Sequence, residues 1–389
     1  MRRALFIITI LAATTIQAQE PAGIDAAVES ILANNATLKA LRHETDAAKA
    51  EAHATNALPD PEVTFGYLWH GRKDVSVSQQ FDWATITGRR RAATASADTL
   101  AEATYGMAAR EVELRARLAY IGAVQGNALT RLLSVRLDRA SRMAEIARRR
   151  LAAGTGRRAD VASTATAKAK ATGELAKAQA DLDSRLAELA ALNGGQAIAV
   201  SDTTFSSMPA LYGDFQSWLA SNGGELTAVA VSQAEASRAK AVASVGRAEN
   251  MPQFSIGYMG EFTPNESYEG VTLGVSVPLW SARKKARQNT LTLRAAEQRH
   301  AATQIEARAE AEALFNRALT LGRVAAELHE SLEQADDRAL YVKAVEQGEM
   351  SAAEAIVAEE VYYDAAVAAI DAEAEYRAAV AEVWARVGR

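Results

Sequence analysis

Two carboxylates placed alike in two parts of the chain are among the side chains whose type and spacing could do chemistry. Asp160 follows Gly154 by six residues, and Glu354 follows Gly348 by six residues. Each glycine lies where a helix must reverse, since glycine readily adopts the positive φ of a helix C-terminus. An acid near the N-terminus of the next helix stabilises that helix through its dipole. This local role is one interpretation of both carboxylates.

Other residues that carry chemistry are absent or unsuitably spaced. The chain has no Cys, which excludes a disulfide scaffold, a thiol nucleophile and a zinc site with Cys ligands. Of the five His residues, only His43 and His53 lie near one another, ten residues apart. No Gly-rich phosphate loop and no Ser/His/Asp arrangement is present. We therefore predict no enzyme, no cofactor and no metal site.

The composition favours long helices over a large compact core. Of the 389 residues, 49% are apolar, but alanine supplies much of that share and only 6% are aromatic. Such a composition is typical of long helices and coiled coils. The formal net charge of −5 is small, so nothing indicates binding to nucleic acid.

The N-terminus has the layout of a secretory signal peptide. Arg2 and Arg3 precede a short apolar run at 5–13, and Ala18 supplies a small residue at the cleavage site. This run is shorter than the roughly 20 residues that a spanning helix needs. No other stretch predicts a transmembrane helix. We therefore expect an exported protein whose membrane crossing, if any, is made of strands.

Several anchors recur at a nearly constant spacing, which predicts an internal duplication. Residues 61–67 (PEVTFGY) match 252–258 (PQFSIGY) at an offset of 191, and 151–154 (LAAG) match 345–348 (VEQG) at an offset of 194. Residues 192–194 (LNG) and 386–388 (RVG) close the two halves, again 194 residues apart. The halves run from about 57 to 194 and from about 248 to 388.

Each half opens with two segments that alternate strictly between apolar and small or polar residues. On one face of the first pair we expect Val63, Phe65, Tyr67, Trp69, Val75, Val77, Phe81 and Trp83. On one face of the second pair we expect Phe254, Ile256, Tyr258, Phe262, Val271, Leu273, Val275, Val277 and Leu279. This pattern fits membrane β-strands, although a half-buried hairpin of a soluble protein has it too. Isolated hairpins are marginal, so these strands need further partners.

Long helical stretches follow each strand pair. No proline occurs from 89 to 151 or from 282 to 347, and both stretches carry a heptad seam rich in small residues. Return helices are predicted at about 158–192 and 352–386, and shorter helices at about 24–57 and 224–249. Residues 194–223 differ in composition and predict a small non-helical segment.

Basic clusters begin both long helices. They are Arg89, Arg90 and Arg91 in the first half and Arg283, Lys284 and Lys285 in the second. Positive charge at a helix N-terminus is locally unfavourable, so another reason is expected. One hypothesis places both clusters at lipid headgroups, with Trp83 and Trp280 as interface aromatics. The alternative is that they are ordinary solvated residues.

Taken together, these patterns resemble the TolC-type outer-membrane efflux proteins over essentially the whole mature chain. The most telling segments are 75–93 (VSVSQQFDWATITGRRRAA), 271–286 (VTLGVSVPLWSARKKA), 151–161 (LAAGTGRRADV) and 345–356 (VEQGEMSAAEAI). Residues 79–92 are most similar to the heavy-metal, cobalt–zinc–cadmium type of outer-membrane component.

The resemblance implies a mixed α and β fold, mostly α, with an internal two-fold duplication. It implies a homotrimer with a twelve-stranded transmembrane β-barrel in the outer membrane of a Gram-negative bacterium, continued by a long periplasmic α-helical barrel. The implied function is the passive exit duct of a tripartite efflux pump, in contact with outer-membrane lipid. Its implied partners are a periplasmic adaptor protein and an inner-membrane RND-type transporter.

Site residues follow from the same resemblance. The two glycine turns would form the tip that meets the adaptor, with Leu151, Gly154, Val345 and Gly348 as contacts. Glu354 matches a family carboxylate in an acidic ring at the periplasmic gate, where a ring of acids would concentrate cations. Asp160 and Glu359 are the other gate candidates, while the family's further acid falls at Val357, where this sequence departs from the pattern.

Three alternatives and one division of the chain complete the expectations. The same duct could export drugs or other organic compounds or serve type I secretion, or the chain could be a non-transporting coiled-coil protein of the envelope. The expected division is a signal peptide (1–18), an N-terminal helix with an equatorial segment (19–56), a first repeat (57–194; β-hairpin 62–83, helical hairpin 89–193), an equatorial linker and helix (195–247) and a second repeat (248–389; β-hairpin 253–280, helical hairpin 284–387).

Overall fold

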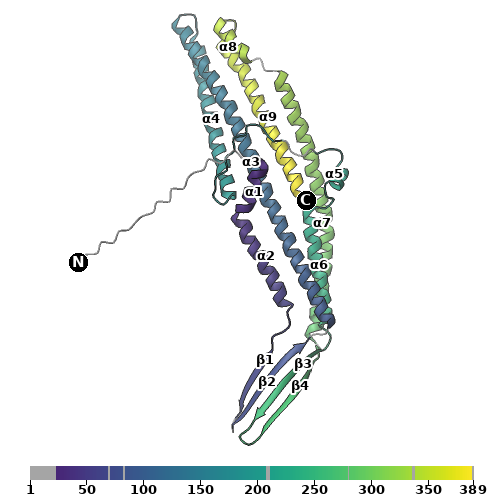
Figure 1. Ribbon diagram of the computed structural model, residues 1–389. Helices are drawn as coiled ribbons and strands as arrows, with labels where there is room; N and C mark the ends of the chain where they lie inside the picture. Colours follow the sequence, from purple (N-terminus) through teal and green to yellow (C-terminus); the bar gives the residue numbers. More distant parts are fainter. Residues whose placement is uncertain are drawn as a thin grey trace, which may run out of the picture.

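A computed structural model of the chain describes residues 23–68, 71–81, 84–206, 211–278, 280–334 and 338–387. The expected signal peptide at 1–18 and three residues of the predicted strand pairs, Trp69, Trp83 and Leu279, lie outside this description. A small sheet occupies one end of an elongated molecule, and helices run from it to two turns at the other end (Figure 1). The elements are α1 (Ile24–Asn34), α2 (Ala36–Thr55), β1 (Glu62–Leu68), β2 (Arg72–Phe81), α3 (Ala84–Ala152), α4 (Arg158–Leu192), α5 (Phe215–Ser221), α6 (Thr227–Ala248), β3 (Gln253–Phe262), β4 (Ser267–Ser276), α7 (Ser281–Gln334), α8 (Arg338–Gln347) and α9 (Ala352–Arg386).

The longest helix is α3, whose 69 residues span about 100 Å at 1.5 Å per residue. It begins at Ala84, five residues before the expected start at Arg89, because Ile86 is fully buried and packs the first turn against its neighbours. The return helices α4 and α9 have the bounds that the sequence predicts. Figure 1 shows α3 leading to a turn and the return helix α4, and α8 leading to a turn and the return helix α9.

In the Pro-free stretch after Ala282 the described residues are helical as α7 and α8, and residues 335–337 lie outside the described part of the chain. Two helical predictions are corrected. The helix expected over 24–57 is two helices, since the side chain of Asn35 accepts a hydrogen bond from the Leu38 N–H (3.0 Å) and so starts α2 as an N-cap. The 194–223 segment contains α5, capped by Asp214.

An aromatic cluster explains why α5 forms in a segment that lacks a helical pattern. Trp218 is buried (1% exposed), and its ring lies 5.3 Å from that of Phe315 on α7 and 5.1 Å from that of Trp384 on α9. Burial of such large side chains contributes far more than local helix propensity. Tertiary contact therefore decides this element.

The four strands form one antiparallel sheet in the order β1-β2-β3-β4. Val63 pairs with Val77, Val77 with Tyr258, and Tyr258 with Val271, so one row crosses all four strands. Phe81, Phe254 and Val275 form a second row, which crosses β2, β3 and β4. The hairpins that the sequence extends to 83 and 280 end as strands at Phe81 and Ser276. The sheet joins two hairpins that lie far apart in the sequence.

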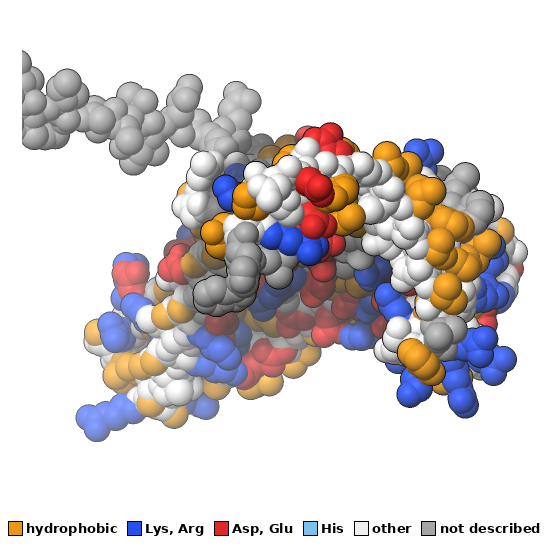
Figure 2. All heavy atoms as spheres, turned by 90° about the horizontal axis from the view of Figure 1, so that it is seen from below, with side chains coloured by type: hydrophobic (Ala, Val, Ile, Leu, Met, Phe, Trp, Pro, Cys, Tyr) orange, Lys and Arg blue, Asp and Glu red, His pale blue; other side chains and the backbone are white. Residues whose placement is uncertain are grey.

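Opposite faces of the sheet differ in character, as the alternation predicts. The apolar face is solvent-exposed in one chain, with Phe65 76%, Leu273 80% and Val271 73% exposed. In the view from below, hydrophobic side chains gather in a band at the near end of the molecule, with Lys and Arg beside it (Figure 2). The other face carries glycine and small polar residues that fit closely, since a Cβ on Gly257 would lie 2.7 Å from the Thr272 hydroxyl.

Helices in the described ranges include none that is both long and apolar enough to span a membrane.

Candidate functional site

The two glycine turns lie at the end of the molecule opposite the sheet (Figure 1). We name the segment 150–160 the first tip and the segment 345–356 the second tip. Gly154 has φ 76° and Gly348 has φ 80°, the left-handed conformation that favours glycine. The helix ends are closed alike, because Thr155 N donates to Arg150 O (2.9 Å) and Glu349 N to Ala344 O (2.9 Å).

The tips contact each other within one chain. The Arg150 guanidinium donates to the carbonyl oxygen of Val345 at 2.9 Å and lies above Gly348, where an added Cβ would approach it to 3.3 Å. Beneath the turns, Val345 (1% exposed) is buried with Met143 and with residues of α9. Of the predicted adaptor contacts, Leu151, Gly154 and Gly348 are therefore exposed, whereas the Val345 side chain supports the turn from inside.

Glu354 belongs to a capping box at the start of α9. Its carboxylate accepts hydrogen bonds from the Ser351 N–H (2.9 Å) and hydroxyl (2.8 Å), while the Ser351 hydroxyl accepts from the Glu354 N–H (3.2 Å). The Ser351 hydrogen bonds, backbone first, lower the pKa of the Glu354 carboxyl, and the nearby charge of Arg157 adds to this. The side chain is exposed and ionised, and it has a structural task in its own helix.

Asp160 occupies the same third position of α4 without such a cap. The N-cap residue of α4 is Arg157, which makes no side-chain capping hydrogen bond. The Asp160 carbonyl oxygen accepts from the hydroxyls of Ser163 (3.1 Å) and Thr164 (2.7 Å). Its carboxylate takes part in no ion pair with the described residues. Equivalent acids thus have different local environments in the two tips.

Glu359 is buried (6% exposed) and lies 2.6 Å from the Arg139 guanidinium. A charge so removed from water is stable only when paired. Glu359 therefore presents no free carboxylate at this end of the molecule. It joins α9 to α3 through a contact that the sequence analysis did not anticipate.

Further ion pairs extend this contact along the helices. Arg136 lies 2.7 Å from Glu174 on α4 and 3.9 Å from Asp364 on α9, and its guanidinium lies over the Tyr363 ring at 5.3 Å. Lys170 on α4 pairs with Glu360 on α9. The sequence does carry a signal for these ion pairs. Arginines lie beside the heptad seam of α3, and adjacent glutamates lie opposite them in α9.

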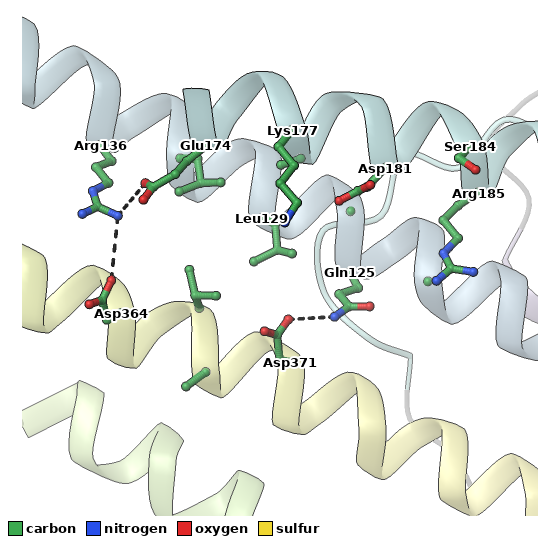
Figure 3. Close-up of a pocket in the computed structure, with 16 residues that line it drawn as sticks. Gln125, Leu129, Arg136, Glu174, Lys177, Asp181, Ser184, Arg185, Asp364 and Asp371 are labelled. Carbon is green, nitrogen blue, oxygen red and sulfur yellow. Dashed lines mark hydrogen bonds and ion pairs between the residues drawn. The ribbon is translucent and has the colours of Figure 1, made fainter. Parts of the chain in front are cut away.

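Below this network a groove of about 890 Å³ runs between α4 and α9, with α3 as its floor. Figure 3 shows Glu174, Lys177 and Asp181 entering from α4, Asp364 and Asp371 from α9, and Gln125 from α3. Gln125 donates to Asp371 at 2.7 Å. The lining is charged and mixed in sign, which suits a wet surface rather than a site for an apolar ligand.

Basic clusters at the sheet end have divided roles. Arg90 and Lys285 lie 3.6 and 3.4 Å from Glu249, and Arg89 donates to the Ser244 carbonyl at 3.3 Å. The other described residues that were predicted at the membrane interface are exposed. They are Arg91, Arg283, Lys284 and Trp280. Part of the positive charge is thus used to join α3 and α7 to the C-terminus of α6.

His, Cys, Asp and Glu side chains in the described ranges form no group of three or more that could hold a metal ion. His53 contacts Asp98 at 3.2 Å, and His300 contacts Ser232 at 2.8 Å. These histidines therefore have structural partners.

Comparison with solved structures places the fold. The chain is similar to the outer-membrane channel OprN (16% identity, TM-score 0.74, 93% of this chain and 89% of that one). It is similar to the CmeC outer membrane channel of Campylobacter jejuni (15%, TM-score 0.75, 93% and 85%) and to the outer membrane protein VceC of Vibrio cholerae (15%, TM-score 0.74, 94% and 96%). No protein-family model and no curated protein matches the chain. The chain thus shares its fold with outer-membrane channels.

Proposed function

We propose that the protein is the outer-membrane exit duct of a tripartite efflux pump. The observation that carries this proposal is the sheet, which exposes a continuous apolar face at the end of helices about 100 Å long. Exposed apolar faces of this extent mark contact with another apolar phase. A lipid bilayer supplies that phase, and the likeness in fold to outer-membrane channels supports this choice.

Assembly as a homotrimer follows from the open edges of the sheet. In one chain, β1 and β4 each have a single paired neighbour, so each leaves one row of backbone groups unpaired. Pairing of β1 in one copy with β4 in the next would close a twelve-stranded barrel from three copies, with the small polar face lining the lumen. The shared order of strand pair, long helix, glycine turn and return helix supports an internal duplication.

Lipid contact is tested by two neighbouring residues on opposite faces of β1. Phe65→Arg puts a charge on the proposed lipid face and should cost about 2–4 kcal/mol of insertion free energy. Thr64→Arg, its matched control, puts the same charge on the proposed lumen face. Fractionated membranes should lose the Phe65 variant and retain the Thr64 variant in the detergent-requiring outer-membrane fraction. Equal amounts of the two variants, or a wild-type protein released without detergent as expected of an envelope stalk, would contradict the proposal.

At the sheet end, Arg91, Arg283 and Lys284 are proposed to contact lipid headgroups, with Trp280 at the interface. They are exposed, and Trp280 is 78% exposed. Arg90 and Lys285 are assigned to Glu249 instead.

At the other end, the tips are proposed to meet a periplasmic adaptor protein, which joins the duct to an inner-membrane RND-type transporter. Leu151, Gly154 and Gly348 would make the contact, and Val345 would hold the second tip in shape. Gly348→Val should strain the turn and abolish cross-linking to the adaptor while the barrel still inserts. Intact export in that variant would leave these glycines with a purely structural role.

We propose that Glu354 faces the lumen near the gate and gives it cation preference. Glu354→Gln removes the charge but keeps a side chain that can complete the capping box, and Ser351→Ala removes the cap but keeps the charge. Cation selectivity in planar bilayers should fall only in Glu354→Gln. A fall in Ser351→Ala alone would assign Glu354 to helix capping. Asp160 is proposed as a second gate acid, and Glu359 is left out because Arg139 neutralises it.

The proposed cargo is divalent heavy-metal cations, on the similarity of residues 79–92 to the heavy-metal branch. Deletion of the gene should sensitise cells to cobalt, zinc or cadmium salts and not to organic drugs. Sensitivity to drugs alone would assign the same duct to organic efflux.

A further inference from the structure

Charge on the small polar face of the sheet gathers at the end farthest from the helices (Figure 1). One row of paired residues crosses the four strands there, from Gly66 through Asp74 and Glu261 to Tyr268. In the rows nearer the helices, the paired strands place serine, threonine, glycine, glutamine and methionine on this face, with Glu62 as their one charged residue. The polar face is therefore ionic mainly at its free end.

A single arginine lies between the two carboxylates of this row. Asp74 on β2 and Glu261 on β3 are directly opposite each other in the register, and like charges in such a cross-strand pair repel. Nε of Arg72 lies 2.8 Å from Oε1 of Glu261 and 3.5 Å from Oδ1 of Asp74. One positive charge thus bridges two negative charges, and the group keeps a net negative charge.

Space for this group comes from Gly66, the residue opposite Asp74 on β1. A Cβ on Gly66 would lie 3.3 Å from Oδ2 of Asp74, so the carboxylate lies against a residue that has no side chain. The side chains of Arg72, Asp74 and Glu261 remain 48%, 33% and 26% exposed. Ion pairs so open to water contribute about 0–1 kcal/mol to stability. Stabilisation of the sheet alone is therefore a weak reason for three charges at this place.

Other charges at this end of the sheet are placed differently. Glu266 accepts a hydrogen bond from the Tyr268 hydroxyl beside the β3–β4 turn. Lys73 and Glu269 lie on the opposite, apolar face, since successive strand residues alternate between faces. Lys73 therefore carries the same charge as Arg72, one residue along the chain, on the other side of the sheet.

We propose that Arg72 sets the ion preference of the outer mouth of the duct, as a tethered counter-ion between Asp74 and Glu261. This inference rests on the proposed function, in which the polar face lines the lumen of a barrel formed by three copies. Three such groups would then surround the mouth, and rings of charged side chains concentrate ions of the opposite sign. The carboxylates attract cations, and Arg72 weakens their hold, so that a cation that arrives can also leave.

The natural absence of Cys allows the local ion preference to be measured on the full chain in the outer membrane of intact cells. Ser76→Cys puts a thiol on the polar face, one row from Asp74. Its reaction rates with a trimethylammonium and a sulfonate methanethiosulfonate reagent are compared at low salt. Because both reagents attack the same thiolate, a change in its reactivity cancels in the ratio of the two rates.

In the Ser76→Cys chain, Arg72→Gln should raise the ratio of cationic to anionic rate several-fold. Asp74→Asn with Glu261→Gln leaves the arginine without its acids and should lower the ratio below that of Ser76→Cys alone. Arg72→Lys keeps the charge, and Lys73→Gln removes a charge from the other face, so both should stay close to Ser76→Cys alone.

A ratio that ignores Arg72→Gln, or that shifts equally in Arg72→Gln and Lys73→Gln, would overturn the proposal. If Arg72→Gln does not reach the membrane, the Asp74→Asn and Glu261→Gln chain decides, and a ratio that does not fall there would overturn it as well.

Failure of the duct itself has a different signature. Val77→Cys lies on the apolar face, next to Ser76, and should react with neither charged reagent while that face is in lipid. Equal labelling of Val77→Cys and Ser76→Cys would contradict the barrel. Labelling of Ser76→Cys alone, with a ratio that ignores Arg72, would overturn the role of Arg72 and leave the barrel standing.

Discussion

The two tips have the same backbone shape and different side-chain chemistry. Both turn on a glycine of positive φ, and both place an acid at the third position of the return helix. In the second tip, Ser351 and Glu354 satisfy each other in a capping box, whereas Arg157 in the first tip leaves its helix uncapped by a side chain. The return helix of the second tip is therefore capped by its own side chains, and that of the first tip is not.

That difference teaches that equivalence in sequence position does not give equivalence in role. Glu354 caps its own helix through hydrogen bonds, while Arg157 makes no side-chain capping hydrogen bond at the start of α4. The difference also predicts that the two tips respond unequally to matched substitutions.

The largest expected effect comes from the ion pair that ties the hairpins together beneath the tips. Arg139→Ala leaves the Glu359 carboxylate buried without its partner, which should cost about 3–5 kcal/mol of unfolding free energy. Arg142→Ala removes an exposed pair with Asp138 one turn away on the same helix and should cost about 1 kcal/mol or less. Chemical denaturation of both variants in detergent measures the difference. Similar costs would show that burial does not distinguish these pairs.

The glycine turns give the next largest effect. Gly154→Ala and Gly348→Ala both force a side chain into the left-handed region at a cost of about 1–2 kcal/mol each. The Gly348 variant should lose more, because its Cβ lies 3.3 Å from the Arg150 guanidinium while that of Gly154 meets nothing within 4 Å. Paired thermal unfolding curves compare them. A greater loss at Gly154 would contradict the contact between the tips.

A smaller effect distinguishes the two tips by how the stability of their return helices depends on pH. The pKa of Glu354 is lowered in the folded chain from an ordinary value of 4.5, so its carboxylate stabilises the fold above that pH, and this stabilisation is lost as pH falls through the lowered pKa. Ser351→Ala should cost about 1 kcal/mol at neutral pH and somewhat less once Glu354 is protonated, because only the bond from the Ser351 hydroxyl to the carboxylate weakens, while the bond that this hydroxyl accepts from the Glu354 N–H does not depend on pH. Hydrogen exchange at the first turn of α9, followed from pH 7 downwards and corrected for intrinsic rates, measures this. Arg157→Ala should cause no loss of that kind at α4, since no side-chain cap is removed.

Local patterns predicted much of the fold. Strict alternation identified the faces of the strands, and Gly154 and Gly348 with the following apolar spacing identified the return helices at their observed bounds. Features that depend on distant partners were not predictable in this way. Trp218 orders α5 only because Phe315 and Trp384 lie beside it.

The tip residues show the same division. The glycines were predictable because their backbone conformation restricts the residue type. The burial of Val345 and the pairing of Glu359 with Arg139 were not, since each depends on how the first hairpin packs against the second. A sequence pattern gives the periodicity of one element and carries little information on its neighbour.

Single-channel recording of the purified full chain in planar bilayers tests the central claim most directly. A duct with a constricted tip should give discrete, cation-preferring steps of low conductance, and Arg139→Ala, which loosens the contact between the hairpins, should raise that conductance. Phe65→Arg should abolish insertion and therefore current. A monomeric protein that gives no steps at any voltage, in wild type and in Arg139→Ala alike, would contradict the account.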